Sequence, residues 1–137
     1  MMDVDTCAVV ALPKFTDARG SLSFVEAGVH VPFAIERVYY LYDLSKDAGR
    51  GAHAHKDLHQ LMIPLAGSFD IVLDDGAQKR RIHLASPSEG LYICPMIWRD
   101  LENFEPNSVC LVLASRKYDE ADYFRDYDAF LKARNPA

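Results

Sequence analysis

The most informative part of this chain is the stretch Arg50-Gly51-Ala52-His53-Ala54-His55-Lys56, together with the residues that follow it as far as Gly67. Two histidines stand two residues apart in this stretch. Side chains in a β-strand alternate between two faces, so both imidazoles are expected on the same side. The small alanines on either side of His53 leave space around its ring. The stretch therefore predicts a strand that presents a histidine pair to one face of a sheet.

The spacing of Gly51, His53, His55, Gln60 and Gly67 is similar to the first cupin signature. In that signature two histidines, a glutamate and a glycine lie along a hairpin of a small barrel. Here a glutamine stands at the glutamate position. The resemblance implies a barrel of the cupin type with an altered site.

The rest of the chain predicts an all-β fold. Short runs of β-branched and aromatic residues alternate with turn residues such as Asp74-Asp75-Gly76, a pattern typical of a small sandwich or barrel. We expect strands over residues 7–12, 21–26, 35–42, 52–56, 59–65, 68–73, 78–84, 91–94, 98–104 and 109–114. Only the tail predicts a helix, which begins at Asp119 or Asp122 and has a packing face of Phe124, Tyr127, Phe130 and Leu131. The prediction is one cupin-type antiparallel β-sandwich or barrel (jelly roll), residues 1–137, with one C-terminal helix.

Composition narrows the class of protein. Half of the 137 residues are hydrophobic, and the formal net charge of -5 argues against non-specific binding to nucleic acid. No apolar run approaches the ~20 residues of a membrane helix, and the N-terminus does not resemble a signal peptide. The three widely spaced cysteines, Cys7, Cys94 and Cys110, favour reduced thiols. We expect a cytoplasmic protein that binds no membrane and forms a homodimer to cover its exposed strand edges.

A histidine pair of this kind has three interpretations. Zinc and iron sites use such pairs but need further ligands, and the two remaining cupin ligand positions are occupied by Gln60 and Arg99. A guanidinium stays protonated and does not ligate a metal. His59 and Asp100 are neighbours that would replace the missing ligands only if they reached the same face.

The second interpretation is a pair of hydrogen-bonded core histidines.

The third interpretation is acid–base chemistry. Imidazole titrates near neutrality, so it takes up and returns a proton at cellular pH. A tyrosine hydroxyl, here that of Tyr39, relays protons between oxygen atoms. Arginines hold phosphate through forked hydrogen bonds, and the candidates are Arg19, Arg37, Arg50 and Arg99.

Segments spread over nearly the whole chain resemble the dTDP-sugar 3,4-ketoisomerases. The His-Ala-His run and the tail carry the most specific likeness. The matching segments are 19–22, 32–33 with Ile35, 37–40, 50–56, 73–76, 90–92, 112–115 and 118–123.

The resemblance implies a metal-free enzyme without an organic cofactor, active as a dimer with exchanged N-terminal strands. Such enzymes convert dTDP-4-keto-6-deoxy-D-glucose to a 3-keto isomer in the synthesis of 3-amino sugars of surface polysaccharides. In these enzymes the first histidine of the pair, here His53, is the base that moves a proton between C3 and C4. The residues that match His55 and Tyr39 assist. The implied substrate-binding residues are Arg19, Arg37, Arg50, Gln60 and Arg99.

The resemblance also leaves alternatives open. Arg99 is similar to the subfamily that forms the gluco product, whereas Arg19 is similar to the galacto subfamily, so the two residues indicate opposite products. The other functions to weigh are a sugar-nucleotide 3,5-epimerase, a metal-dependent cupin oxygenase, and a sugar-nucleotide binding module without activity.

Overall fold

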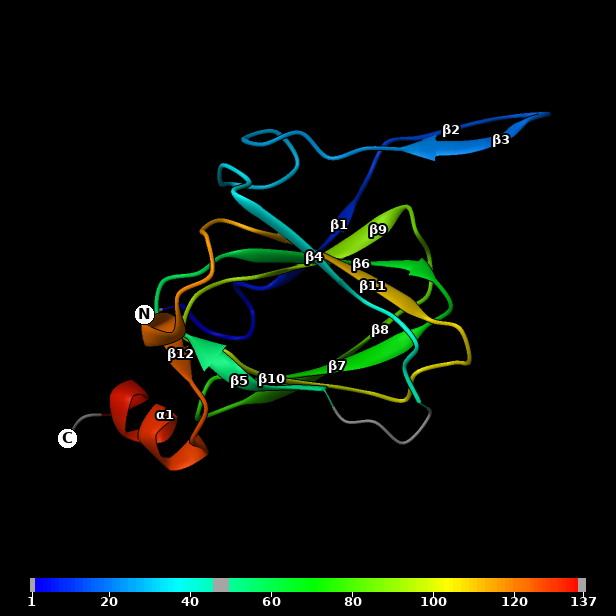
Figure 1. Cartoon of the computed structure of the whole chain (residues 1–137). Helices are drawn as coiled ribbons and strands as arrows, with labels where there is room; N and C mark the ends of the chain where they lie inside the picture. The colour runs from blue at the N-terminus through cyan, green and yellow to red at the C-terminus, as the bar shows by residue number, and fades with distance from the viewer. Residues whose placement is uncertain (1, 46–49, 136–137) are drawn as a thin grey trace.

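Two five-stranded antiparallel sheets face each other and enclose the core (Figure 1). The structure is a computed structural model that describes residues 2–45 and 50–135, without the side chains of 50 and 51. The strands of the first sheet, in spatial order, are β1 (Ala8–Ala11), β9 (Glu89–Ile93), β6 (Gln60–Ala66), β11 (Val109–Ala114) and β4 (Arg37–Leu41). Those of the second are β12 (Tyr123–Phe124), β5 (Arg50–His55), β10 (Trp98–Glu102), β7 (Phe69–Asp74) and β8 (Lys79–Leu84). The described chain confirms the predicted antiparallel sandwich.

The core lies between the sheets because the strands alternate apolar and polar residues. On β7, Phe69, Ile71 and Leu73 are fully buried, whereas Asp70 and Val72 between them remain partly exposed. This period of two is the signature of a strand with one face in the core. Each strand predicted from the sequence has a counterpart within a few residues. Among the described residues, no helix is long and apolar enough to span a membrane.

The C-terminal segment differs from the predicted continuous helix. A 3₁₀ turn, η1 (Glu120–Asp122), is followed by β12 and only then by the helix α1 (Tyr127–Arg134). Asp126 caps α1 through its side chain, so the prediction that the helix begins at Asp119 or Asp122 was wrong. Asp119 caps only the 3₁₀ turn η1. The carboxylate of Asp122 instead contacts β5.

Helix α1 packs its apolar face on the second sheet, as its pattern predicted. Phe130 is fully buried and forms a cluster with Ala54 of β5 and Trp98 of β10. Phe124 and Tyr127 pack against the same cluster. The tail therefore lies across the end of the sandwich where β5 and β10 meet (Figure 1).

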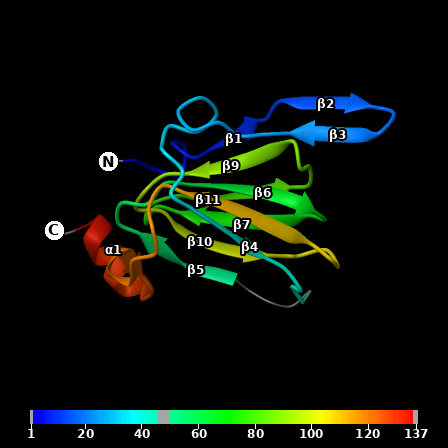
Figure 2. The same ribbon diagram turned by 45° about the horizontal axis from the view of Figure 1, so that its top comes forward.

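A hairpin that the sequence predicted only in part projects from the sandwich. The strands β2 (Lys14–Asp17) and β3 (Gly20–Ser23) pair only with each other, and every residue in them is exposed. The sequence indicated the second of these strands but not the first. Figure 2 shows the hairpin extending away from the two main sheets.

Gly67, between β6 and β7, occupies a position that no other residue fits. Gly67 has φ +71°, and a Cβ there would lie 2.2 Å from the Ser108 Oγ. That hydroxyl donates to the Glu105 carbonyl at 2.7 Å and accepts from the Ser68 N–H, so it has little freedom to move. Both the backbone conformation and the close approach therefore require glycine.

We expect Gly67→Ala to destabilise the fold by about 3 kcal/mol, from left-handed strain and overpacking together. The melting temperature should fall by roughly 10 °C, which calorimetry would measure. Gly28→Ala is the matched control, since its φ is also positive (+75°) but nothing lies within 4 Å of its Cβ position. Equal losses in the two variants would show that the contact with Ser108 has no effect.

Candidate active site

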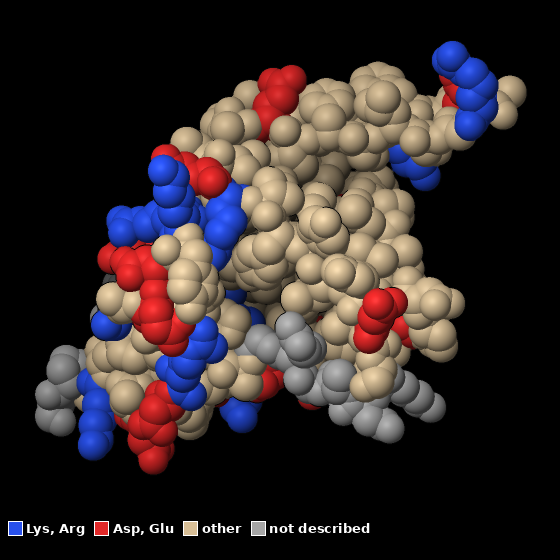
Figure 3. All heavy atoms as spheres, in the orientation of Figure 1, with Lys and Arg blue, Asp and Glu red and all other residues tan. Residues whose placement is uncertain are grey.

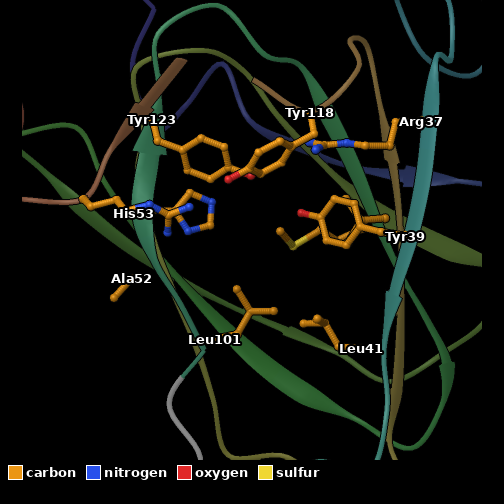
Figure 4. Close-up of a pocket in the computed structure, with 11 residues that line it drawn as sticks. Arg37, Tyr39, Leu41, Ala52, His53, Leu101, Tyr118 and Tyr123 are labelled. Atoms are coloured by element: carbon orange, nitrogen blue, oxygen red, sulfur yellow. The ribbon is translucent and has the colours of Figure 1, made fainter. Parts of the chain in front are cut away.

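A cavity of about 500 Å³ opens between the two sheets, and the histidine strand forms one of its walls (Figure 4). Strand β4 forms the opposite wall with Arg37, Tyr39 and Leu41. Tyr118 and Tyr123 of the C-terminal segment lie at one end of the cavity, its mouth, and Leu41 and Leu101 lie at the other end (Figure 4). The remaining lining residues are Ala52, His53, Met62, Val112 and Arg125.

The two histidines of β5 face the interior together, as their spacing predicted. Their Nε2 atoms lie 3.0 Å apart, and the rings are perpendicular. His55 is fully buried, whereas His53 is half-buried and its ring points into the cavity. Ala54 between them points the other way and is buried beneath α1. The ring of Tyr123 packs on both imidazoles, with centroids 5.1 and 4.3 Å away.

The surroundings of the pair favour neutral imidazoles. Burial, followed by the positive charge of Arg99, lowers the pKa of His53 from 6.5 to about 3. The same two causes lower the pKa of His55 further. Both rings are therefore neutral at physiological pH, and a neutral imidazole is the form that accepts a proton.

A second chain of hydrogen bonds crosses the interior from Tyr39 to Arg99. The Gln60 side-chain amide donates to the Tyr39 hydroxyl at 2.8 Å, and its carbonyl oxygen accepts from the guanidinium of Arg99. Arg99 is fully buried and also donates to the Ile97 carbonyl. Burial raises the pKa of Tyr39. This tyrosine therefore keeps its proton near neutral pH and faces the cavity as a donor.

Arginines and tyrosines surround the mouth of the cavity. The Arg37 guanidinium lies over the rings of Tyr39 and Tyr118, at 5.2 and 5.6 Å from their centroids, and Arg125 lies 4.2 Å from that of Tyr123. The Nε of Arg37 is buried without a hydrogen-bond partner in the described chain. Figure 3 shows Lys and Arg side chains interspersed with Asp and Glu side chains on the side of the molecule that carries η1 and α1. Arg125 pairs there with the Glu120 carboxylate, whereas the unpaired Nε of Arg37 is free to bind an anion.

The structure brings together most of the side chains that the sequence singled out. His53, Tyr39 and Arg37 line the cavity, and His55, Gln60 and Arg99 lie directly behind it. They come from β4 and β6 of the first sheet and from the paired strands β5 and β10 of the second.

Three candidates lie elsewhere or outside the described atoms. Arg19 lies in the turn of the β2–β3 hairpin, pairs with Asp17, and does not line the cavity of its own chain. Arg50 begins β5, but its side chain is outside the described part of the structure. His59 lies apart from the pair, where its Nδ1 and the Tyr92 hydroxyl are 2.7 Å apart.

The sequence reasoning missed the contributions of the tail. Tyr118, Tyr123 and Arg125 line the cavity, and Asp122 contacts His55. The resemblance included residues 118–123 but assigned them no role. These tail residues lie more than sixty positions after the histidines in the sequence. Local sequence patterns do not predict that residues so far apart meet in the fold.

A neutral histidine pair, a tyrosine and a cationic rim in a small β-sandwich define a site for proton transfer on an anionic substrate. Comparison with known proteins is more specific. Residues 5–135 match the family described as FdtA: WxcM-like, C-terminal. The chain belongs to this family, whose characterised relatives are sugar 3,4-ketoisomerases.

Three relatives illustrate the match. The chain is 45% identical to a TDP-4-oxo-6-deoxy-alpha-D-glucose-3,4-oxoisomerase of Aneurinibacillus thermoaerophilus over 124 residues, 90% of this chain and 89% of the relative. QdtA, the sugar 3,4-ketoisomerase of Thermoanaerobacterium thermosaccharolyticum crystallised with TDP, has a TM-score of 0.94 at 41% identity, covering 97% of both chains. The WlaRB TDP-quinovose 3,4-ketoisomerase of Campylobacter jejuni has a TM-score of 0.90 at 46% identity, covering 94% of this chain and 99% of its own.

The donor set at the cupin ligand positions does not fit a metal. Both nitrogens of His55 face other side chains, the Nε2 of His53 and the carboxylate of Asp122. Gln60 and Arg99 bond to each other. Among the described residues, no cluster of three or more His, Cys, Asp or Glu side chains is placed to hold a metal ion.

We expect turnover to be independent of metal. Dialysis against EDTA, followed by assay in metal-free buffer, should leave the rate within about 20% of the untreated enzyme, because Gln60 and Arg99 at the cupin ligand positions bond to each other. Loss of activity that one added divalent metal restores would contradict this expectation. The control is the same dialysis without chelator.

Proposed function

We propose that this protein is a nucleotide-sugar isomerase that moves the ketone of dTDP-4-keto-6-deoxy-D-glucose from C4 to C3. The observation that carries the proposal is a neutral His53 that faces the same cavity as the Tyr39 hydroxyl. A proton next to a ketone is acidic enough for a positioned base to remove. The family relationship supports this substrate class.

The proposed reaction needs a carbon base and an oxygen relay. His53 takes the proton from C3, and the electron pair of the C3–H bond forms an enediolate across C3 and C4. Tyr39 supplies the proton for O4 and accepts the one from O3. His53 then returns its proton to C4, which leaves the ketone at C3. The charge of Arg99, transmitted through the Gln60–Tyr39 hydrogen bonds, stabilises the enediolate.

The diphosphate of the substrate fits the mouth of the cavity. Arg37 has an unpaired buried Nε. Arg125, which also lines the cavity, pairs with Glu120 in this structure and would exchange that carboxylate for the diphosphate. Arginine binds phosphate oxygens through paired N–H donors. The sugar ring then extends inward to His53. The exposed tyrosine Tyr118, which also lines the mouth, offers a flat surface for the nucleotide base.

His53→Asn should lower kcat by at least 10³-fold, because the amide cannot accept the C3 proton. The affinity for TDP should change by less than about threefold, since the nucleotide contacts lie at the mouth. NMR in D₂O would follow hydrogen exchange at C3 and the position of the ketone, and calorimetry would measure TDP binding. Turnover close to wild type would assign the base to another residue.

His83→Asn is the matched control for that experiment. His83 is an exposed histidine on β8 whose Nδ1 lies 2.7 Å from the carboxylate of Asp70. It has no contact with the cavity, so its loss should leave kcat and TDP affinity unchanged.

A wild-type protein that binds TDP but leaves the keto-sugar unchanged would support a binding module instead.

We also propose that the protein acts in the cytoplasm as a homodimer with exchanged N-terminal hairpins. The apolar side chains Phe15 and Leu22 of the β2–β3 hairpin are 62% and 58% exposed, although Phe15 stacks on Phe24. A largely apolar groove of about 420 Å³ runs beside this hairpin over the outer face of the first sheet, where Val38 is 54% exposed. Covering such surfaces is the usual reason for association.

The thiols of Cys7 and Cys94 lie 3.7 Å apart and are not joined by a disulfide. Free thiols this close together fit a reducing compartment such as the cytoplasm.

Val38→Asp should convert the dimer to a monomer, because the carboxylate would be buried without a partner. Light scattering coupled to gel filtration should give twice the chain mass of 15.4 kDa for the wild type and a single chain mass for the variant. Gln78→Asp, at an exposed turn beside the second sheet, is the control that should stay dimeric. A monomeric wild type would contradict the proposal.

A further inference from the structure

A carboxylate lies directly behind the histidine pair. The Oδ2 of Asp122 is 2.9 Å from the Nδ1 of His55, and the two side chains are only 9% and 1% exposed. His55 in turn contacts His53 through Nε2. The three side chains therefore form a continuous row from the interior of the tail to the cavity.

Asp122 is held rigidly in this position. Its Oδ1 accepts the backbone N–H of Asp57 at 2.8 Å, and its carbonyl oxygen accepts the N–H of Lys56 at 2.8 Å. Both bonds attach η1 to the end of β5, next to the pairing of Tyr123 with His55. Both carboxylate oxygens thus have a partner, and the group is oriented before any substrate arrives.

These contacts determine where the histidine protons lie. A carboxylate only accepts hydrogen bonds, so His55 carries its proton on Nδ1 and leaves Nε2 bare. The 3.0 Å contact between the two Nε2 atoms then requires the proton of His53 to be on its Nε2. The Nδ1 of a neutral His53 is left with a free lone pair, since the side-chain hydrogen bond of His53 in the described chain is made by its Nε2.

We propose that Asp122 is a positioning residue of the isomerase reaction: through His55 it holds His53 in the tautomer whose bare Nδ1 accepts the substrate proton. The inference rests on the proposed function and deepens it. When the C3–H bond breaks, the proton bonds to Nδ1 of His53. The proton on Nε2 of His53 then moves to Nε2 of His55, and the resulting imidazolium is an ion pair with Asp122. Reversal of both transfers delivers a proton to C4.

The positive charges around the histidines explain why a carboxylate behind them would help His53 to accept a proton. Arg99 on β10 and Arg125 on the tail disfavour a positive charge on both histidines, Arg37 on β4 disfavours one on His55, and Glu120 favours one on His53. A base in this setting accepts a proton poorly. Burial and these charges lower the pKa of His55 further than that of His53, so a charge shared with His55 needs the opposite charge of the Asp122 carboxylate, 2.9 Å away.

Asp122→Asn is the sharpest test, because it keeps the shape and reverses the hydrogen bonds. The amide oxygen accepts the Asp57 N–H, so the amide nitrogen donates to Nδ1 of His55. His55 then carries its proton on Nε2, His53 must accept there, and the base atom Nδ1 becomes protonated. We expect kcat to fall about 10²–10³-fold with KM within threefold. Asp122→Glu, which restores a carboxylate, should recover part of the loss.

Asp128→Asn is the control, since it removes an exposed carboxylate of the same C-terminal segment that has no hydrogen bond to a histidine in the described chain. Its kcat should be that of the wild type. Nitrogen-15 NMR of the imidazoles provides the readout that a structural role would not change. The proton of His55 should lie on Nδ1 in the wild type and on Nε2 in Asp122→Asn.

Wild-type kcat in Asp122→Asn, or a wild-type His55 protonated on Nε2, would overturn the proposal. The second measurement needs only the unmodified protein, so it decides the matter even if the variant fails to fold. A wild type that does not turn over the keto-sugar would instead contradict the proposed function, and the tautomers would still test the role of Asp122.

Discussion

The interior of this sandwich contains a guanidinium that solvent does not reach, and much of the site depends on it. Burying a charge costs several kcal/mol unless hydrogen bonds compensate. Arg99 directs its N–H groups to the Ile97 carbonyl and the Gln60 side chain, both of which are uncharged. The hydrogen bonds are satisfied, but these partners leave the positive charge in place. Its field lowers the pKa of both histidines and opposes the rise that burial causes in the pKa of Tyr39.

The sheet pairing directs that field at the reacting groups. Arg99 lies opposite His53 in the register of β10 with β5, and the register shifts between Arg99 and Leu101. On its other side β10 pairs with β7, which places the strand inside the sheet rather than at an edge. Arg99 is therefore held on both sides, and Gln60 extends its influence to Tyr39 on the opposite sheet. One buried cation thus connects the carbon base with the oxygen relay.

The local part of this site was predictable from the sequence. Alternation placed His53 and His55 on one face, which the structure confirms. The absence of a metal, predicted from Gln60 and Arg99, stays a prediction, and these two side chains bond to each other. Long-range placement was not predictable. Asp122 lies 67 residues after His55, and the periodicity of the tail indicated one helix where the chain makes a 3₁₀ turn and a short strand. The pairing of that short strand with β5 is a tertiary effect, which no local pattern contains.

The position of Arg19 is a second case in which the sequence did not predict long-range placement. Local sequence correctly predicts a turn at residues 17–20, but the direction of the hairpin depends on what covers its apolar side chains. Where the hairpin docks is therefore a property of two chains rather than one, if the protein dimerises as proposed.

The proposed substrate itself supplies the last element of the chemistry. Without it, the histidines face the charges of Arg99, Arg37 and Arg125, and they are poor bases. A diphosphate at the mouth brings negative charge close to Arg37 and Arg125 and offsets part of their field. The pKa of the pair should therefore rise when a nucleotide sugar binds, and it should rise again as the enediolate develops negative charge. Recognition of the remote diphosphate would thus contribute directly to the basicity of His53, which is a means of using binding energy in the transition state.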